Sequence, residues 1–125
     1  MFATIDAAEA AFYSAIERHD VNAMCDIWSN SDRAAYIEPN GNAAVGIEAI
    51  IETMAHAFAS APFVQFELTH LTQSEPGNSA AIRLVRENVT FVADNRKTAL
   101  MGTNVFRRDA TGWKILLHQA TRLAT

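Results

Sequence analysis

The chain has little of what staples a small protein or carries it into a membrane. Of its 125 residues only Cys25 is a cysteine, which excludes an intramolecular disulfide and suits a reducing compartment. No apolar run approaches the roughly 18–20 residues that a membrane-spanning helix needs. Near its start the chain carries the acids Asp6 and Glu9 and no basic cluster, so a secretory signal is not expected. These absences predict a cytoplasmic protein that does not associate with membranes.

Basic residues are outnumbered as well. The chain has 10 lysines and arginines against 14 aspartates and glutamates, which gives a net charge of −4. Because no basic stripe stands out, nucleic acid is not an expected partner. His19, His56 and His70 lack the spacing of metal ligands, and neither a glycine-rich phosphate loop nor a nucleophile-elbow serine is present. We therefore expect neither a metal nor another cofactor.

What the chain does have is enough apolar material for one core. Hydrophobic residues make up 50% of it and charged residues 19%, a balance that is typical of globular proteins. About two-thirds of the unfolded surface can be buried at this size. Since no linker interrupts the sequence, we expect a single domain over residues 1–125.

The first half of the chain has helical spacing. Apolar residues recur every three or four positions, first after Thr4, which is a plausible N-cap. The spacing predicts helices over 5–19, 21–28 and 47–59. Between the second and the third, a short strand from Ala34 to Glu38 stops at the turn sequence Pro39-Asn40-Gly41.

From Phe63 onward the apolar period changes from about 3.6 to 2. This alternation predicts strands over 63–74, 79–93, 98–108 and 113–121, joined by turns at 75–78, 94–97 and 109–112. Helices followed by long sequential strands indicate an α+β fold. We expect a cone-shaped, curved antiparallel sheet that wraps on three N-terminal helices and encloses a pocket.

Polar residues interrupt these otherwise apolar strands. Alternation places Glu87 on one face with Val85 and Val89, and it places Asn104 on one face with Phe106. A carboxylate on an apolar face needs a partner or a raised pKa. Glu87 therefore either pairs with a basic group such as Arg83 and serves the fold, or it is a catalytic group in a pocket.

The last strand carries two further polar residues next to each other. Strict alternation puts Trp113 and Gln119 on one face and His118 on the other. If the face of Trp113 lines the pocket, Gln119 faces the ligand and His118 points to the outer surface of the sheet. In that case His118 belongs to the surface or to an interface rather than to a catalytic site.

Several large side chains on the helices and the first strand have two interpretations. They line a ligand pocket, or they are ordinary core residues at helical spacing. The residues concerned are Tyr13, Trp28, Tyr36, Met54 and Phe58.

The order of these elements, together with several short motifs, resembles the nuclear transport factor 2-like superfamily, in its SnoaL-like and ketosteroid-isomerase-like branch. The resemblance covers nearly the whole chain and implies the cone fold, a pocket between helices and sheet, and a homodimer through the outer sheet face. It rests on Ala11-Phe12-Tyr13, His19-Asp20, Asp26-Ile27-Trp28, Tyr36-Ile37-Glu38-Pro39-Asn40-Gly41, Gly46-Ile47-Glu48-Ala49-Ile50, Thr103-Asn104-Val105-Phe106-Arg107-Arg108 and Gly112-Trp113-Lys114-Ile115.

The resemblance also implies roles for individual residues. It places Glu87 inside the cone, and it places Glu38, before the proline, where such isomerases have a general base; the alternative is a surface glutamate bound by loop amides. Asn104 stands where they have a neutral acid that donates a hydrogen bond to an oxyanion. Phe12 stands where they have a tyrosine, so one of the two oxyanion donors is absent unless Tyr13 beside it replaces that tyrosine through a rotated helix face. Steroid isomerase activity is therefore not expected.

Three functions fit this pattern. The first is a cofactor-independent isomerase, cyclase or lyase, in which Glu87 or Glu38 moves a proton and Asn104 and Gln119 orient a small apolar or amphipathic molecule. The second is a module that binds such a molecule without chemistry. The third is a structural homodimer whose cavity is vestigial.

Overall fold

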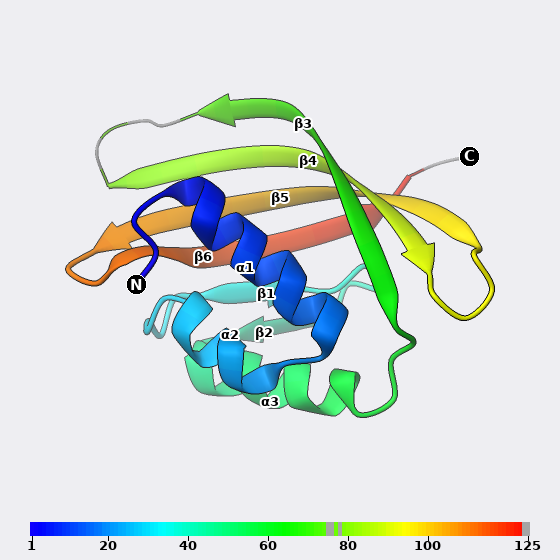
Figure 1. Cartoon of the computed structure of the whole chain (residues 1–125). Helices are drawn as coiled ribbons and strands as arrows, with labels where there is room; N and C mark the ends of the chain where they lie inside the picture. The colour runs from blue at the N-terminus through cyan, green and yellow to red at the C-terminus, as the bar shows by residue number, and fades with distance from the viewer. Residues whose placement is uncertain (75–76, 78, 124–125) are drawn as a thin grey trace.

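Three helices lie against one face of a six-stranded sheet in the computed structural model, which describes residues 1–74, 77 and 79–123 (Figure 1). The predicted turn at 75–78 lies outside the described residues except for Gly77. The predicted α+β class and the three helices are confirmed. The elements are α1 (Ile5–Arg18), α2 (Val21–Ile27), β1 (Ala35–Ile37), β2 (Ala43–Val45), α3 (Ile47–Phe58), β3 (Val64–Ser74), β4 (Ala80–Phe91), β5 (Lys97–Asp109) and β6 (Gly112–Arg122).

Side-chain caps fix the start of the first two helices. The Thr4 hydroxyl accepts a hydrogen bond from the Ala7 amide at 3.1 Å, and the Asp20 carboxylate accepts one from the Ala23 amide at 3.0 Å. Between the two helices His19 adopts a left-handed conformation, with φ of 53°. This sharp turn folds α2 back beside α1, so that both helices contribute to one core.

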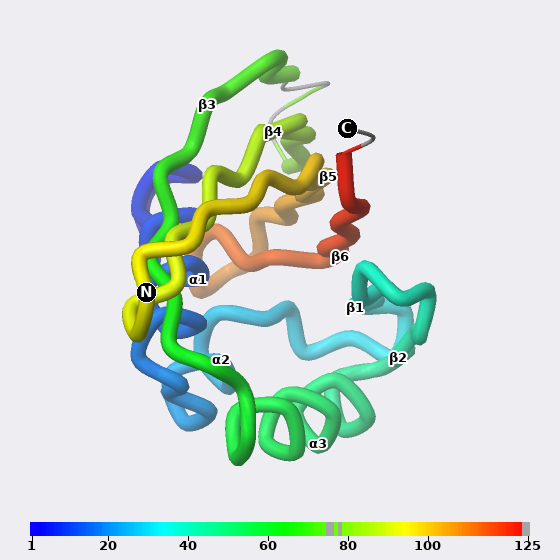
Figure 2. Tube along the Cα trace, turned by 90° about the vertical axis from the view of Figure 1, so that its right-hand side faces the viewer, coloured from blue at the N-terminus to red at the C-terminus, as the bar shows by residue number. Residues whose placement is uncertain are grey.

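The strands follow the order β2-β1-β6-β5-β4-β3, with β1 parallel to β6 and all other neighbours antiparallel. The sequence did not predict β2, a three-residue strand that pairs with β1 across the Pro39 turn. Figure 2 shows the long strands following an arc around α1, with α3 closing the lower side. The parallel pairing sets Tyr36 of β1 beside His118 of β6.

A β-bulge in β6 overturns the predicted orientation of two residues. Val105 pairs with Leu117 and Phe106 pairs with Ile115, so Leu116 has no partner and the alternation changes phase there. Trp113 and Ile115 before the bulge are buried, as predicted, but after it His118 is buried instead of Gln119. The prediction that Gln119 faces the pocket and His118 faces outward is therefore wrong: the inserted residue exchanges the two faces.

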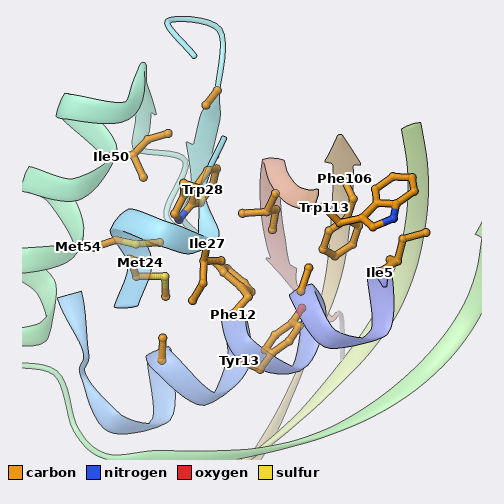
Figure 3. Close-up of a cluster of buried hydrophobic side chains, with 14 of the residues drawn as sticks. Ile5, Phe12, Tyr13, Met24, Ile27, Trp28, Ile50, Met54, Phe106 and Trp113 are labelled. Carbon is orange, nitrogen blue, oxygen red and sulfur yellow. The ribbon is translucent and has the colours of Figure 1, made fainter. Parts of the chain in front are cut away.

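Large apolar side chains fill much of the space between helices and sheet (Figure 3). Phe12 of α1 packs edge-on against Trp28 with ring centroids 6.0 Å apart, and Met54 of α3 lies in the same cluster. On the opposite face of the sheet, the side chains of β4, β5 and β6 are exposed or half-buried. The helices thus cover one face only, and the polar groups of interest lie on that covered face.

Candidate functional site

Four buried polar residues form a chain of hydrogen bonds between α1 and the sheet. The hydroxyl of Tyr13 donates to Glu87 Oε2 at 2.5 Å, and Asn104 Nδ2 donates to the oxygen of Tyr13 at 2.9 Å. His118 Nδ1 lies 2.6 Å from Asn104 Oδ1. The exposed fractions are 4% for Tyr13, 2% for Glu87, 0% for Asn104 and 5% for His118. We call these four residues the polar network.

Three strands and one helix bring the polar network together. Tyr13 lies on the buried face of α1, and Glu87 lies on the inward face of β4, as alternation predicts. Asn104 of β5 is directly opposite His118 of β6, which is the pairing that the bulge at Leu116 creates. Tyr13 therefore links a pair of neighbouring strands to a carboxylate that comes from a third.

Gly102 of β5 makes room for the Glu87 carboxylate. A Cβ atom at Gly102 would lie 2.6 Å from Glu87 Oε2 and 3.2 Å from a methyl group of Val85. The residue opposite Gly102 on β6 is Ala120, which is also small. Because Gly102 does not have a positive φ, its role here is space rather than backbone conformation.

The hydrogen bonds of the polar network run in one direction. Tyr13 gives its only proton to Glu87, so its oxygen accepts from the Asn104 amide nitrogen, and the Asn104 oxygen then accepts from His118 Nδ1. In a neutral imidazole this leaves Nε2 without a proton, 3.9 Å from Glu87 Oε2. The other carboxylate oxygen of Glu87, Oε1, accepts no hydrogen bond from the described residues.

Burial shifts the pKa values of Glu87, His118 and Tyr13 to different extents and in different directions. Desolvation raises the pKa of Glu87 to about 7, against a smaller lowering by the hydrogen bond from Tyr13. Desolvation also lowers the pKa of His118 to about 3, so the imidazole is neutral. Burial and the nearby Glu87 carboxylate raise the pKa of Tyr13. Glu87 is therefore the member of the polar network that changes charge near neutral pH.

Arg83 does not pair with Glu87, although Arg83 was the basic partner that the sequence suggested for this carboxylate. Arg83 Nη2 lies 2.6 Å from Asp6 Oδ1, and its Nη1 lies 3.1 Å from Glu9 Oε1. Glu9 also contacts His70 Nε2 at 2.8 Å. This second cluster is one helical turn from Tyr13 and engages Arg83 with two carboxylates, so Glu87 has no guanidinium partner among the described residues.

Tyr36 connects the polar network to the surface. Its ring stacks on His118 with centroids 5.8 Å apart and an interplanar angle of 19°, and the residue is half-buried. Burial, followed by the charges of Glu38 and Glu87, raises the pKa of Tyr36 to about 12. Glu38 begins the turn between β1 and β2, where its backbone bonds Asn42 and Gly41, and its carboxylate joins no ion pair or hydrogen bond among the described residues.

The remaining predicted ligand contacts lie apart from the polar network. Trp28 and Met54, each 1% exposed, belong to the packed core (Figure 3). Phe58 stacks on His19 at 5.3 Å, at the end of α1. Gln119 pairs with Thr103 and is half-buried on the uncovered face of the sheet.

Sequence reasoning missed two members of this site, Gly102 and His118. A glycine within an apolar strand signals a close approach by another group, and this signal was present for Gly102. His118 had no such signal, because its orientation depends on a bulge that no glycine or proline marks in the sequence.

No helix in the described part of the chain is long and apolar enough to cross a membrane. Within the same residues, no cluster of three or more histidine, cysteine, aspartate or glutamate side chains is arranged to hold a metal ion.

Comparison with known proteins places this geometry in context. The sequence model of the SnoaL-like domain matches residues 5–124. No curated protein sequence matches the chain. A candidate calcium/calmodulin-dependent protein kinase type II association domain from Thiobacillus denitrificans is similar, with a TM-score of 0.91 and 30% identity over 99% of this chain and 98% of that one.

Two further solved structures are informative. A candidate dehydratase of the nuclear transport factor 2-like family from Streptomyces avermitilis has a TM-score of 0.86 and 26% identity, over 97% of this chain and 94% of that one. A ketosteroid isomerase-like protein from Erwinia carotovora atroseptica has a TM-score of 0.71 and 21% identity, over 97% and 95% of the two chains. At that identity the last similarity shows a shared fold.

Proposed function

This chain belongs to the SnoaL-like family of the nuclear transport factor 2-like superfamily, and from this premise we propose that it is a cofactor-independent acid–base enzyme that acts on a small organic carbonyl compound. The observation that carries the proposal is Glu87: a carboxylate 2% exposed, without a cationic partner among the described residues, and with a pKa raised to about 7. A general base is most effective when its pKa lies near the working pH.

In the proposed reaction Glu87 removes a proton from the carbon next to the carbonyl group. The carbon–hydrogen bond breaks, the proton goes to Oε1, and the electron pair moves onto the carbonyl oxygen as an enolate. Oε1 is the suitable acceptor because Oε2 already receives the hydrogen bond of Tyr13. Return of the proton to another carbon gives an isomerase, whereas loss of a leaving group gives a lyase and attack on a second carbonyl gives a cyclase.

The other members of the polar network position this base. The bond from Tyr13 fixes the carboxylate, and Asn104 and His118 fix Tyr13 in turn. Neutral His118 adds no charge that would lower the pKa of Glu87. Leu68 and Leu100 lie directly opposite Glu87 on the neighbouring strands and are half-buried, so in this proposal the substrate approaches the carboxylate between them.

The similarity to a candidate dehydratase at 26% identity supports the lyase form of this proposal. A dehydratase removes a proton and a hydroxyl group from neighbouring carbons, and its first step is the one assigned to Glu87. The proposed ligand is small and apolar or amphipathic, since the side chains around the carboxylate are mostly apolar.

Hydrogen–deuterium exchange tests the proposed step without knowledge of the substrate. The protein is incubated in D2O with cyclohexanone, cyclohexenone and acetophenone, and the loss of the protons next to each carbonyl is followed by NMR. We expect catalysed exchange with at least one ketone, rising in rate as pH increases through about 7. Glu87→Gln should reduce it at least about 100-fold, whereas the control Glu52→Gln, on the exposed side of α3, should leave it unchanged. Equal rates in wild type and Glu87→Gln would contradict the proposal.

A second proposed function, a structural homodimer formed through the uncovered sheet face, has its own support. Ile82 is 39% exposed on that face; its cross-strand neighbour Val105 and the partner of Val105 on β6, Leu117, are half-buried without a covering element among the described residues. The similar Thiobacillus denitrificans chain is a candidate association domain. Dimerisation and the chemistry of Glu87 use opposite faces of the sheet, so the two proposals are compatible.

A further inference from the structure

A wide, open hollow of about 820 Å³ lies on the sheet near the β4–β5 turn, away from the polar network. Its volume is within the range of roughly 300–1,000 Å³ that is usual for small-molecule sites. Arg86 and Asn88 of β4 and Lys97 of β5 line it together with Arg122 at the end of β6, while Glu67 of β3 adds one acid.

The positive charge of this hollow is unusual for the chain. The protein as a whole carries a net charge of −4, yet the three cations around the hollow outnumber the single acid. No ion pair joins Arg86, Lys97 or Arg122 to a carboxylate within the residues that the structure describes. By contrast, Arg83 on the covered face has two carboxylate partners. The cations of the hollow are therefore available to a ligand.

Hydrogen bonds along β4 and β3 fix the direction of one of these cations. Arg86 Nε donates to Asn88 Oδ1 at 3.0 Å, and Asn88 Nδ2 donates to the backbone oxygen of Glu67 at 3.0 Å and to Thr69 Oγ1 at 3.3 Å. Since Nε is already engaged, the two terminal amino groups of Arg86 remain for an external acceptor. A guanidinium group held in this way suits bidentate contact with a carboxylate or a phosphate.

From these observations we infer that the hollow binds a small anion with two or more negatively charged oxygens, a dicarboxylate or a phosphate, through Arg86, Lys97 and Arg122. The anion lies against Arg86, whose orientation Asn88 fixes, and Lys97 and Arg122 supply the remaining charge. Glu67 repels the anion and limits its affinity. Arg86 and Lys97 lie on the face of the sheet opposite to Glu87, whereas Arg122 pairs with Leu100 and reaches the hollow from the end of β6. The main contact of the anion, Arg86, is therefore separate from the chemistry of Glu87.

NMR titration of the full chain tests this inference with two probes, succinate and inorganic phosphate, at constant ionic strength. We expect saturable shifts of the amide signals of Arg86, Asn88 and Lys97 with at least one probe. Arg86→Gln should weaken that binding at least about tenfold, whereas Glu67→Gln should tighten it. Arg107→Gln is the matched control, since it removes the same charge from an exposed position of β5 that does not line the hollow.

The outcomes of the titration either identify the chemical class of the anion or overturn the inference. Saturation by succinate alone assigns a carboxylate ligand, and saturation by phosphate alone assigns a phosphorylated one. Absence of saturable shifts with both probes would overturn the inference. An equal loss of affinity in Arg86→Gln and Arg107→Gln would also overturn it, because this result indicates attraction to net charge rather than a site. Both variants change exposed residues, so they should fold, and the exchange assay of Glu87 is unaffected by either result.

Discussion

At the scale of single residues, Gly102 decides where the carboxylate of Glu87 lies, because it has no side chain. The side chain of Glu87 reaches Tyr13 by crossing above Gly102, where any larger residue would meet it. Glu87 thus depends on a position that contributes no chemistry. Its environment, rather than its chemical type, separates it from the other carboxylates of the chain.

Adding one methyl group at Gly102 tests this dependence. Gly102→Ala would set a carbon 2.6 Å from Glu87 Oε2, so the carboxylate must shift from its present position, and we expect its hydrogen bond with Tyr13 to weaken. We expect a loss of about 1–3 kcal/mol in the free energy of unfolding, measured with urea. In a Glu87→Ala background the clash with the carboxylate is absent and only the 3.2 Å contact with the Val85 methyl group remains, so the same substitution should cost less. Additive effects in this double-mutant cycle would show that Gly102 does not serve Glu87.

Glu87 and His118 should also give the stability opposite dependences on pH. The folded protein holds the proton of Glu87 more tightly than the unfolded chain does, because burial raises its pKa from 4.5 to about 7. The stabilisation is complete below pH 4.5 and is lost as pH rises through about 7, by up to roughly 3 kcal/mol. For His118, burial lowers the pKa from 6.5 to about 3, so stability is lost as pH falls through that interval.

Single variants separate these two contributions. Urea unfolding of Glu87→Gln between pH 4 and 8 should show stability that rises with pH, since the effect of His118 remains. His118→Gln should show stability that falls with pH over the same interval, and the wild type should vary less than either variant. Parallel pH profiles for the wild type and Glu87→Gln would mean that Glu87 titrates near its ordinary pKa.

At the scale of helices and strands, periodicity predicted most of the fold. The helical spacing of residues 5–18 and the alternation of residues 80–91 both follow from burial of one face, so α1 and β4 were predictable almost to their ends. The strand β2 was not, because its three residues are too short for a period to show. Pairing with β1, rather than local preference, makes these residues a strand.

Within the site, the same reasoning succeeded for Glu87 and Asn104 and failed for His118. Alternation is reliable only while the register is unbroken, and the unpaired Leu116 breaks it. The two residues on each side of Leu116 are apolar or amphipathic, namely Lys114, Ile115, Leu117 and His118. The local sequence therefore does not mark the position of the bulge. The pairing of β6 with β5 and β1 decides it, and this information is distributed over distant segments of the chain.

At the scale of the whole molecule, the two faces of the sheet differ in how much apolar surface and charge they leave exposed to solvent. The covered face buries a polar network and a filled core against the helices. The opposite face combines half-buried apolar residues in its middle with Arg86 and Lys97 of the cationic hollow at one end. An apolar surface of this kind is more stable when a second surface covers it.

The proposed homodimer gives the uncovered face that second surface. We expect light scattering after size exclusion to give about twice the chain mass of 13.7 kDa. Val105→Lys places a charge in the apolar middle of this face, among Ile82 and Leu117, and should shift the protein to the mass of one chain. Val92→Lys adds the same charge at another exposed apolar position, 53% exposed beyond the end of β4, and should leave the dimer intact. A wild-type protein with the mass of a single chain would exclude the dimer, and an unchanged mass in Val105→Lys would place its interface elsewhere.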